Sequence, residues 1–177
     1  VPDEVRALVD YCDERSLPLW LVSEQRSRFN YHFNDRVPVV MAEIHTEIPE
    51  RCDLHTMLQE PVVKAVMFLT AQEVREGPLS FMPHARSTQW FIHGQDIIPA
   101  EGGKLPAMRF MAEANGWTPD ELMAFGDSEN DNEMLRYAGT GVAMGNALEE
   151  TKAASDYVTD DCDDEGVAHA LAHFALI

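Results

Sequence analysis

The chain has 177 residues, 45% of them apolar and 25% charged, and its 13 Lys and Arg against 31 Asp and Glu give a formal net charge of −18. This composition is typical of a globular protein, and the length suits one domain of ordinary size or two small ones. The acidic balance excludes nucleic acid and anionic membrane surfaces as partners, because both require clustered basic residues and no basic run is present.

The N-terminal half is predicted to open with a helix and to continue as short strands. Val5, Leu8, Val9 and Cys12 follow an acidic first turn at the i, i+3, i+4, i+7 spacing of an amphipathic helix. Short apolar or β-branched runs between turn residues predict strands over residues 17 to 22, 37 to 41, 62 to 69 and 89 to 92. Residues 53 to 59 and the stretch after Thr70 are predicted to be helical.

From residue 104 onward, helices and strands alternate. Helices are predicted over residues 104 to 115, 128 to 138, 147 to 154 and 165 to 174, with strands over 122 to 126, 141 to 144 and 157 to 159. Such alternation favours a parallel sheet. The change of pattern near residue 96 predicts two domains, residues 1 to 95 and residues 96 to 177.

No apolar run approaches the ~18 to 20 residues of a membrane helix, and no signal peptide is visible at the start of the chain. The three cysteines, Cys12, Cys52 and Cys162, are odd in number and form no CxxC pair. This pattern fits a reducing compartment better than a disulfide framework, so a cytoplasmic location is expected. The oligomeric state is not readable from the sequence.

The clearest candidate site is the acidic turn that follows the strand ending at Gly126. Asp127, Glu129 and Asp131 lie within one turn, and Asp127 comes directly after the strand, at the sheet edge where open α/β sheets bind ligands. Two such charges ~5 Å apart repel by about 3 kcal/mol at an effective dielectric of 20, so a bound cation is expected. Oxygen ligands on a tight turn suit Mg²⁺. A solvated acidic helix start is the alternative interpretation.

A calcium-binding EF-hand loop is a second metal hypothesis for this turn, and the sequence excludes it. Counting from Asp127, the sixth position is Asn132 where that loop needs Gly, and the twelfth is Ala138 where it needs Glu.

Lys104 is one of three lysines in the chain and lies after Gly102 and Gly103, at the predicted start of a helix. A cation opposes the helix dipole there, which is explained if its ammonium neutralises a bound phosphate. An ordinary surface lysine is the alternative.

Four segments in order resemble the C-terminal half of a haloacid dehalogenase superfamily phosphatase of the Cof type. They are Gly102 to Lys104 (GGK), Gly126 to Met134 (GDSENDNEM), Gly141 to Ala147 (GVAMGNA) and Tyr157 to Leu171 (YVTDDCDDEGVAHAL). The resemblance is strong over residues 96 to 174 and weaker over 1 to 95, which look like the family's α/β cap. It implies an α/β fold, part of a Rossmann-like core with a parallel sheet plus a smaller α/β cap domain that sets substrate specificity.

The resemblance also implies roles for single residues. Asp127 resembles the family's magnesium ligand, and Asp131 the acid that orients metal-bound water or the ligand shell, so both are counted as metal and catalytic residues. Asn130 resembles the phosphate-contacting amide, and Lys104 the lysine that binds phosphate and steadies the nucleophile. The implied reaction is Mg²⁺-dependent hydrolysis of a small phosphorylated metabolite, a sugar phosphate for example, through an aspartyl-phosphate.

The family's nucleophile lies in an Asp-x-Asp motif after the first core strand, and no such motif is found in that context. The one Asp-x-Asp is Asp161-Cys162-Asp163, within an acidic string that is read as a solvated turn before the last helix. We therefore expect the nucleophile to lie outside this chain and the chain alone to be inactive. A phosphomutase on the same scaffold and a non-catalytic fragment that binds metal and phosphate are the alternatives.

His169 and His173 are four residues apart on the last predicted helix and raise the possibility of a metal pair. Their positions relative to Val167 and Leu171 place them on the opposite face of the helix, and no third ligand is evident. They are predicted to be surface histidines.

Overall fold

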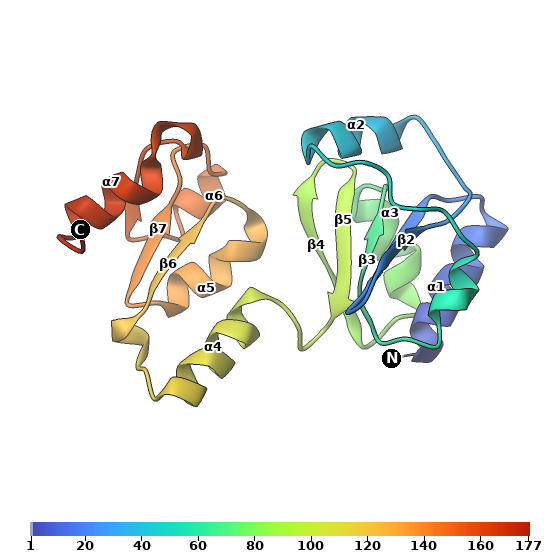
Figure 1. Cartoon of the computed structure of the whole chain (residues 1–177), viewed down its shortest axis with the longest axis horizontal. Helices are drawn as coiled ribbons and strands as arrows, with labels where there is room; N and C mark the ends of the chain where they lie inside the picture. The colour runs from blue at the N-terminus through green and yellow to red at the C-terminus, as the bar shows by residue number, and fades with distance from the viewer. Residues whose placement is uncertain (1) are drawn as a thin grey trace. The chain divides into compact units, whose positions relative to one another are not determined.

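The computed structural model describes residues 2 to 177 and divides into two compact units, one ending at Glu101 and the other beginning at Gly102 (Figure 1). The sequence placed this division after residue 95. Strand β5 (Gly94–Pro99) accounts for the difference, because it pairs with strands β3 and β4 and so belongs to the first unit.

The first unit is built on a five-stranded sheet with the order β2-β1-β3-β5-β4, in which every pairing is antiparallel. Its other strands are β1 (Leu19–Ser23), β2 (Ser27–Phe29), β3 (Val62–Met67) and β4 (Ala85–Phe91). Three of these correspond to the strands predicted at residues 17 to 22, 62 to 69 and 89 to 92. Strands β2 and β5 were not predicted from the sequence.

Helix α1 (Pro2–Glu14) covers one face of this sheet, as its periodicity predicts. Its buried residues Leu8, Val9 and Cys12 form a core cluster with apolar side chains of β1, β3 and β5. The same cluster includes Val74 of α3 (Ala71–Glu76) and Leu54 of the 3₁₀ turn η1 (Leu54–Met57). A second 3₁₀ turn, η2 (Pro78–Ser80), follows α3.

Both short helical predictions in this unit hold, and each helix begins with a side-chain cap. The Asp53 carboxylate accepts from the His55 backbone N–H at the start of η1. Thr70 and Glu73 form a reciprocal capping box at the start of α3, which satisfies two otherwise unpaired N–H groups.

The predicted strand at residues 37 to 41 is wrong, because this segment forms helix α2 (Arg36–Glu43). Val37, Val40 and Met41 are buried at helical spacing against Phe29 and Val66, while Val39 is 54% exposed. Pro38 is tolerated because it lies in the first helical turn, where backbone N–H groups have no partner within the helix. Tertiary packing has overridden the β propensity of the valines.

The second unit contains the predicted parallel sheet, with the order β6-β7-β8. Its strands are β6 (Met123–Gly126), β7 (Thr140–Ala143) and β8 (Tyr157–Val158). Its α-helices are α4 (Lys104–Asn115), α5 (Asn132–Tyr137), α6 (Glu149–Lys152) and α7 (Gly166–His173), and its 3₁₀ turns are η3 (Pro119–Glu121), η4 (Glu129–Asp131) and η5 (Cys162–Asp164). The helix predicted over residues 128 to 138 is therefore η4 followed by α5.

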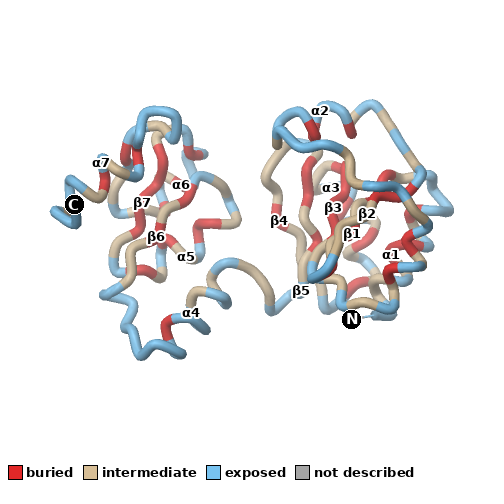
Figure 2. The backbone as a smooth tube through the Cα atoms, viewed as in Figure 1, coloured by how far each residue is buried: buried red, intermediate tan, exposed pale blue. Residues whose placement is uncertain are grey.

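The core of the second unit is small. Its hydrophobic cluster contains the buried residues Ala124, Leu135 and Ala138. Helix α4 has one buried residue, Ala112, and its Phe110 side chain is 69% exposed. Figure 2 shows this contrast as the scarcity of buried positions along α4 compared with the strands of the first unit.

Among the described residues, no helix has both the length and the apolar character that crossing a membrane requires.

Candidate functional site

The acidic turn lies where the sequence analysis placed it, at the carboxyl end of a parallel strand. Strand β6 ends at Gly126, Asp127 follows with an exposed side chain, and η4 begins at Glu129. Two backbone hydrogen bonds tie the turn to the loop after β7: Met144 N–H donates to the Gly126 carbonyl at 2.9 Å, and Leu148 N–H to the Asp127 carbonyl at 3.1 Å. The turn is thus attached at two points to the loop after β7.

The buried Asp131 side chain binds the backbone at the start of the turn. Its side chain is 1% exposed, and its Oδ2 accepts from the backbone N–H groups of Asp127 at 3.1 Å and Ser128 at 3.2 Å. A Cβ on Gly126 would lie 2.3 Å from the Asp131 Cβ, so the strand can end this close to the carboxylate only with glycine at position 126. The Asp131 side chain therefore fixes the backbone from which the Asp127 carboxylate projects.

Lys104 joins the turn from the first residue of α4. Its ammonium donates to Oδ1 of Asp131, and its side chain remains 48% exposed. The pairing offsets the charge of the buried carboxylate, and the ammonium keeps further N–H groups available for an anion. The structure therefore brings Lys104, Asp127, Asn130 and Asp131 together, as the sequence analysis expected.

Asn130 is half-buried, and its Oδ1 atom is enclosed without a hydrogen-bond partner in the described part of the chain. The Oδ1 atom of Asn132 and the Oγ1 atom of Thr151 are also enclosed without a hydrogen-bond partner among the described residues. Enclosed polar atoms are normally hydrogen-bonded, so these three mark a region where further polar contacts are expected.

The donor chemistry of the turn fits Mg²⁺. The Asp127 carboxylate is exposed, and its Oδ1 accepts from the Ser128 hydroxyl at 3.2 Å. Carboxylate and amide oxygens are the ligands that this ion prefers, and the turn from residue 126 to 131 contains no thiol or imidazole that would favour a softer metal. Asp131 was expected as a second ligand, but both its oxygens already contact Lys104 or the backbone.

The one Asp-x-Asp segment of the chain, Asp161-Cys162-Asp163, is a turn before the last helix, as expected. Asp161 caps η5 by accepting from the Asp163 N–H, and Cys162 is exposed. The side chains of Asp161, Cys162 and Asp163 could approach a single ion, but exposed acidic groups of this kind are common without one. The geometry assigns them no catalytic role.

The two histidines of α7 are exposed and have different partners. His169 Nδ1 lies 2.7 Å from Asp160 Oδ2, whereas the His173 ring stacks on Tyr157 with 4.3 Å between ring centroids. They do not form a metal pair.

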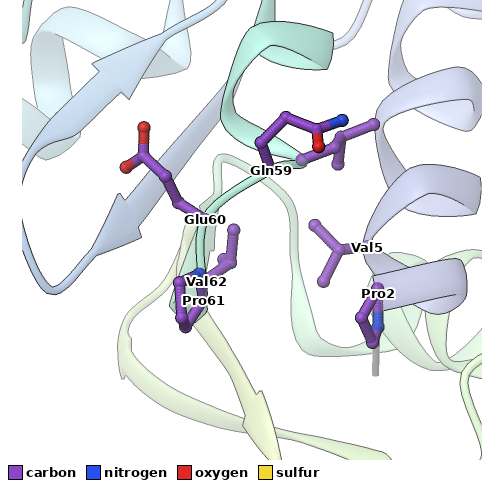
Figure 3. Close-up of a pocket in the computed structure, with 7 residues that line it drawn as sticks. Pro2, Val5, Gln59, Glu60, Pro61 and Val62 are labelled. Carbon is purple, nitrogen blue, oxygen red and sulfur yellow. The ribbon is translucent and has the colours of Figure 1, made fainter.

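A pocket of about 410 Å³ in the first unit lies between the start of α1 and the segment before β3 (Figure 3). Pro2, Val5, Leu58, Pro61 and Val62 make its wall largely apolar, with Gln59 and Glu60 also lining it. The Glu60 carboxylate points away from Val5 in Figure 3 and is bound by Arg26 Nε at 2.7 Å and Ser23 Oγ at 2.8 Å. None of the site residues predicted from the sequence lines this pocket.

The sheet of the first unit carries a charged cluster that was not predicted from the sequence. Lys64 of β3 donates to Asp96 Oδ2 at 2.9 Å, and Trp90 of β4 donates through Nε1 to Asp96 Oδ1 at 3.1 Å. Residue 96 was predicted to begin the second domain, so the place of Asp96 on a strand of the first unit was not foreseen. The β-branched pair Ile97-Ile98, bounded by Gly94 and Pro99, was the available signal.

Comparison with protein families gives a match over nearly the whole chain. A family model described as haloacid dehalogenase-like hydrolase matches residues 1 to 171. YkrA of Bacillus subtilis is 29% identical over 173 residues, which cover 98% of this chain and 66% of YkrA. A phosphoglycolate phosphatase of Methanothermobacter thermautotrophicus is 33% identical over 152 residues, or 81% of this chain and 67% of that protein.

Solved structures resemble the chain over its full length. The sugar phosphatase BT4131, of haloacid dehalogenase subclass IIB, superimposes with a TM-score of 0.87 at 29% identity and covers 100% of this chain. BT1666 from Bacteroides thetaiotaomicron, a phosphatase of the same superfamily, gives 0.84 at 25% identity. The chain spans 68% and 66% of these two chains, respectively, so about a third of each has no counterpart here.

Proposed function

Because the chain belongs to the haloacid dehalogenase-like hydrolases, we propose that its second unit provides the metal- and phosphate-binding half of a phosphatase site. One observation carries this proposal: the Lys104 ammonium is anchored on a buried carboxylate whose other oxygen holds the backbone of Asp127. A cation and an exposed carboxylate are thus fixed at the carboxyl end of a parallel strand, where such sheets bind ligands.

Each residue of the turn has a proposed role. Asp127 supplies an oxygen to Mg²⁺, and Asn130 offers its amide to a phosphoryl oxygen. Lys104 neutralises charge on the transferring phosphoryl group. Asp131 acts as a positioning residue, because its oxygens are occupied by Lys104 and the backbone. When bound, Mg²⁺ supplies further stabilisation of phosphoryl charge and orients the substrate.

The proposed reaction is hydrolysis of a small phosphate monoester, a sugar phosphate in particular, through an aspartyl-phosphate. Covalent catalysis by a carboxylate splits one difficult displacement into two easier steps. The substrate class is supported by the names of similar proteins, which include a sugar phosphatase and phosphoglycolate phosphatases. We assign the first unit, residues 2 to 101, to substrate selection.

The aspartate that forms the intermediate is proposed to lie outside this chain. Asp161 and Asp163, the one Asp-x-Asp pair, belong to the cap of an exposed 3₁₀ turn, and the chain covers about two thirds of its structural relatives. The chain by itself is therefore expected to bind metal and phosphate without turnover.

The test compares the chain with a longer protein that includes the segment found in its relatives. Isothermal titration with Mg²⁺ is applied to the chain, and p-nitrophenyl phosphate hydrolysis is measured on both proteins. We expect Asp127→Ala to abolish Mg²⁺ binding and to lower turnover of the longer protein by roughly a hundredfold or more. Asp120→Ala, an exposed carboxylate of η3 in the same unit, serves as the matched control.

Normal Mg²⁺ binding and turnover in Asp127→Ala would contradict the proposal. If the longer protein binds Mg²⁺ at Asp127 but hydrolyses no phosphate ester, the second candidate gains support: a protein that binds metal and phosphate without catalysis.

A further inference from the structure

The sheet of the first unit has one closed face and one that is partly open. Ala65 and Ile97 belong to the cluster under α1, so the alternate residues of the same strands, Lys64 and Asp96, point to the opposite face. Helix α2 covers part of that opposite face, where its residues pack on Phe29, Val66 and Phe68. Lys64 lies two residues before Val66 on β3, toward the beginning of that strand.

Three side chains on this face form one hydrogen-bonded group, which we call the Lys64 cluster: Lys64, Asp96 and Trp90. The ammonium and the indole N–H bind different oxygens of the Asp96 carboxylate, at 2.9 and 3.1 Å. The Lys64 side chain is 38% exposed and that of Asp96 is 15% exposed. The carboxylate is thus fixed from two sides while the ammonium still reaches solvent.

Trp90 is itself held in place by the backbone. A Cβ at Gly94 would lie within 2.7 to 2.9 Å of three carbons of the Trp90 ring, so the indole packs directly against this glycine of β5. Gly94 and Asp96 are two residues apart on one strand, which places the ring beside the carboxylate that it binds. The cluster therefore contains an aromatic ring in a fixed position as well as paired charges.

The hydrogen-bonding capacity that remains in this cluster suits a ligand with hydroxyl groups. An ionised carboxylate can accept about four hydrogen bonds and an ammonium can donate three, so both groups keep capacity beyond their mutual contact. A donor and an acceptor side by side match two neighbouring alcohol groups, each of which both donates and accepts. Stability is a weaker explanation, because the lysine half of the pair is 38% exposed and is screened by solvent, and the contact leaves this remaining hydrogen-bonding capacity unused.

We propose that the Lys64 cluster binds the polyhydroxylated part of a phosphate ester on the open face of the sheet. This inference rests on the proposed function for the class of substrate. It adds the residues that bind the alcohol portion of the ester, because the acidic turn of the second unit is assigned only to the metal and the phosphate.

The test uses the three tryptophans of the chain, Trp20, Trp90 and Trp117, whose indole N–H groups give separate signals in a ¹H–¹⁵N spectrum. The ¹⁵N-labelled chain is titrated in parallel with D-glucitol 6-phosphate, D-glucitol and inorganic phosphate. We expect the Trp90 signal to shift with both glucitol ligands and to stay in place with phosphate alone. Trp117 belongs to the second unit and reports any change outside the sheet.

Lys64→Met is expected to weaken glucitol 6-phosphate binding by roughly tenfold or more, the usual effect of losing a hydrogen bond to a charged group. Lys152→Met is the matched control, since Lys152 also pairs with a carboxylate, Glu149 at 3.0 Å, but in the second unit. Asp96→Asn keeps an acceptor for Trp90 and removes the charge, and the dispersion of the same spectra shows whether each variant is folded.

A Trp90 signal that neither glucitol ligand moves would overturn the inference. So would equal affinity in Lys64→Met and the unmodified chain, or a Trp90 shift that phosphate alone reproduces. The Mg²⁺ titration of Asp127→Ala is independent of these results. If glucitol shifts the Trp90 signal but the chain does not bind Mg²⁺, the hydroxyl site is supported and the proposed function is contradicted. If the chain binds Mg²⁺ at Asp127 but glucitol shifts no signal, the proposed function is supported and the hydroxyl site is contradicted.

Discussion

Asp131 is the residue that connects the acidic turn to the rest of the second unit. A carboxylate that is 1% exposed is costly unless it is paired, and here a lysine and two backbone N–H groups provide the pairing. The pairing also sets the position of Asp127, whose own backbone is one of the donors. A change at Asp131 should therefore reach the proposed site through its geometry.

Glycine at position 126 allows the Asp131 side chain to pack against the end of β6, and the first prediction concerns the Cβ atom that alanine would add there. Gly126→Ala would place a Cβ 2.3 Å from that of Asp131, and we expect it to destabilise the protein by roughly 2 to 3 kcal/mol, as overpacking typically does. Gly116→Ala is the comparison: its φ of 72° disfavours alanine but its surroundings are open, so a loss of about 1 kcal/mol is expected.

Urea denaturation of the two glycine variants measures the difference, and Mg²⁺ titration should show weakened binding in Gly126→Ala alone. Equal losses of stability with normal Mg²⁺ affinity in both variants would contradict the close packing of Gly126 against Asp131.

His55 links two elements of the first unit, α1 and η1. Its Nε2 lies 2.8 Å from Asp10 Oδ1 on the helix, and its Nδ1 lies 2.9 Å from Asp53 Oδ1, the cap of η1. Asp13 Oδ2 is 3.9 Å from the same Nδ1. The hydrogen bond to Asp10, and then that to Asp53, raises the pKa of His55 above its ordinary value of 6.5.

A pH dependence follows from this pKa shift. A raised pKa means that the folded state holds the proton more tightly, so the contribution is complete below pH 6.5 and is lost as pH rises through the higher folded-state value. Because the His55 side chain is 37% exposed, the loss should be no more than about 1 kcal/mol.

We expect the free energy of unfolding of the first unit to fall as the pH rises above 6.5 in the unmodified chain and to fall less in His55→Gln. Identical slopes in the two proteins would exclude His55 as the source.

Helix α2 gives a second prediction at the scale of elements, from two neighbouring valines. Val40 is 0% exposed and Val39 is 54% exposed. Val40→Ala should destabilise the first unit by roughly 2 kcal/mol, because it removes buried methyl groups, whereas Val39→Ala should stay within about 0.5 kcal/mol. Thermal denaturation of the pair tests this, and similar losses in both would contradict the helix packing.

At the scale of the whole molecule, the large buried side chains are unevenly shared between the units. Among the largest fully buried ones in the described chain, Leu135 is the single member from the second unit, and the others, such as Phe29, Phe68 and Leu8, belong to the first. Because hydrophobic burial is the main favourable term in folding, the first unit should be the more stable.

Tryptophan fluorescence can separate the two units during denaturation. In a Trp20→Phe, Trp90→Phe double variant the remaining Trp117 reports the second unit, and in Trp117→Phe the other two report the first. We expect the Trp117 transition at a lower urea concentration. A single coincident transition for both probes would show that the units unfold together and would contradict the prediction.

Local patterns in the sequence determined much of this protein. The helix at the N-terminus, the alternation of strand and helix after residue 104 and the composition of the acidic turn all depend on residues close together in the chain, so periodicity and motif revealed them. The same holds for the family, whose motifs are short and contiguous, and for the choice of Lys104, Asp127, Asn130 and Asp131 as candidate site residues.

The tertiary structure decided the rest. Residues 37 to 41 became a helix because Phe29 and Val66 offer a surface for Val37, Val40 and Met41, and β5 joined the first unit because β3 and β4 pair with it. The burial of Asp131 beneath Lys104 and the meeting of Lys64 with Asp96 likewise join residues far apart in the chain. Such contacts depend on which surfaces fold against one another, and no local pattern of residue types contains that information.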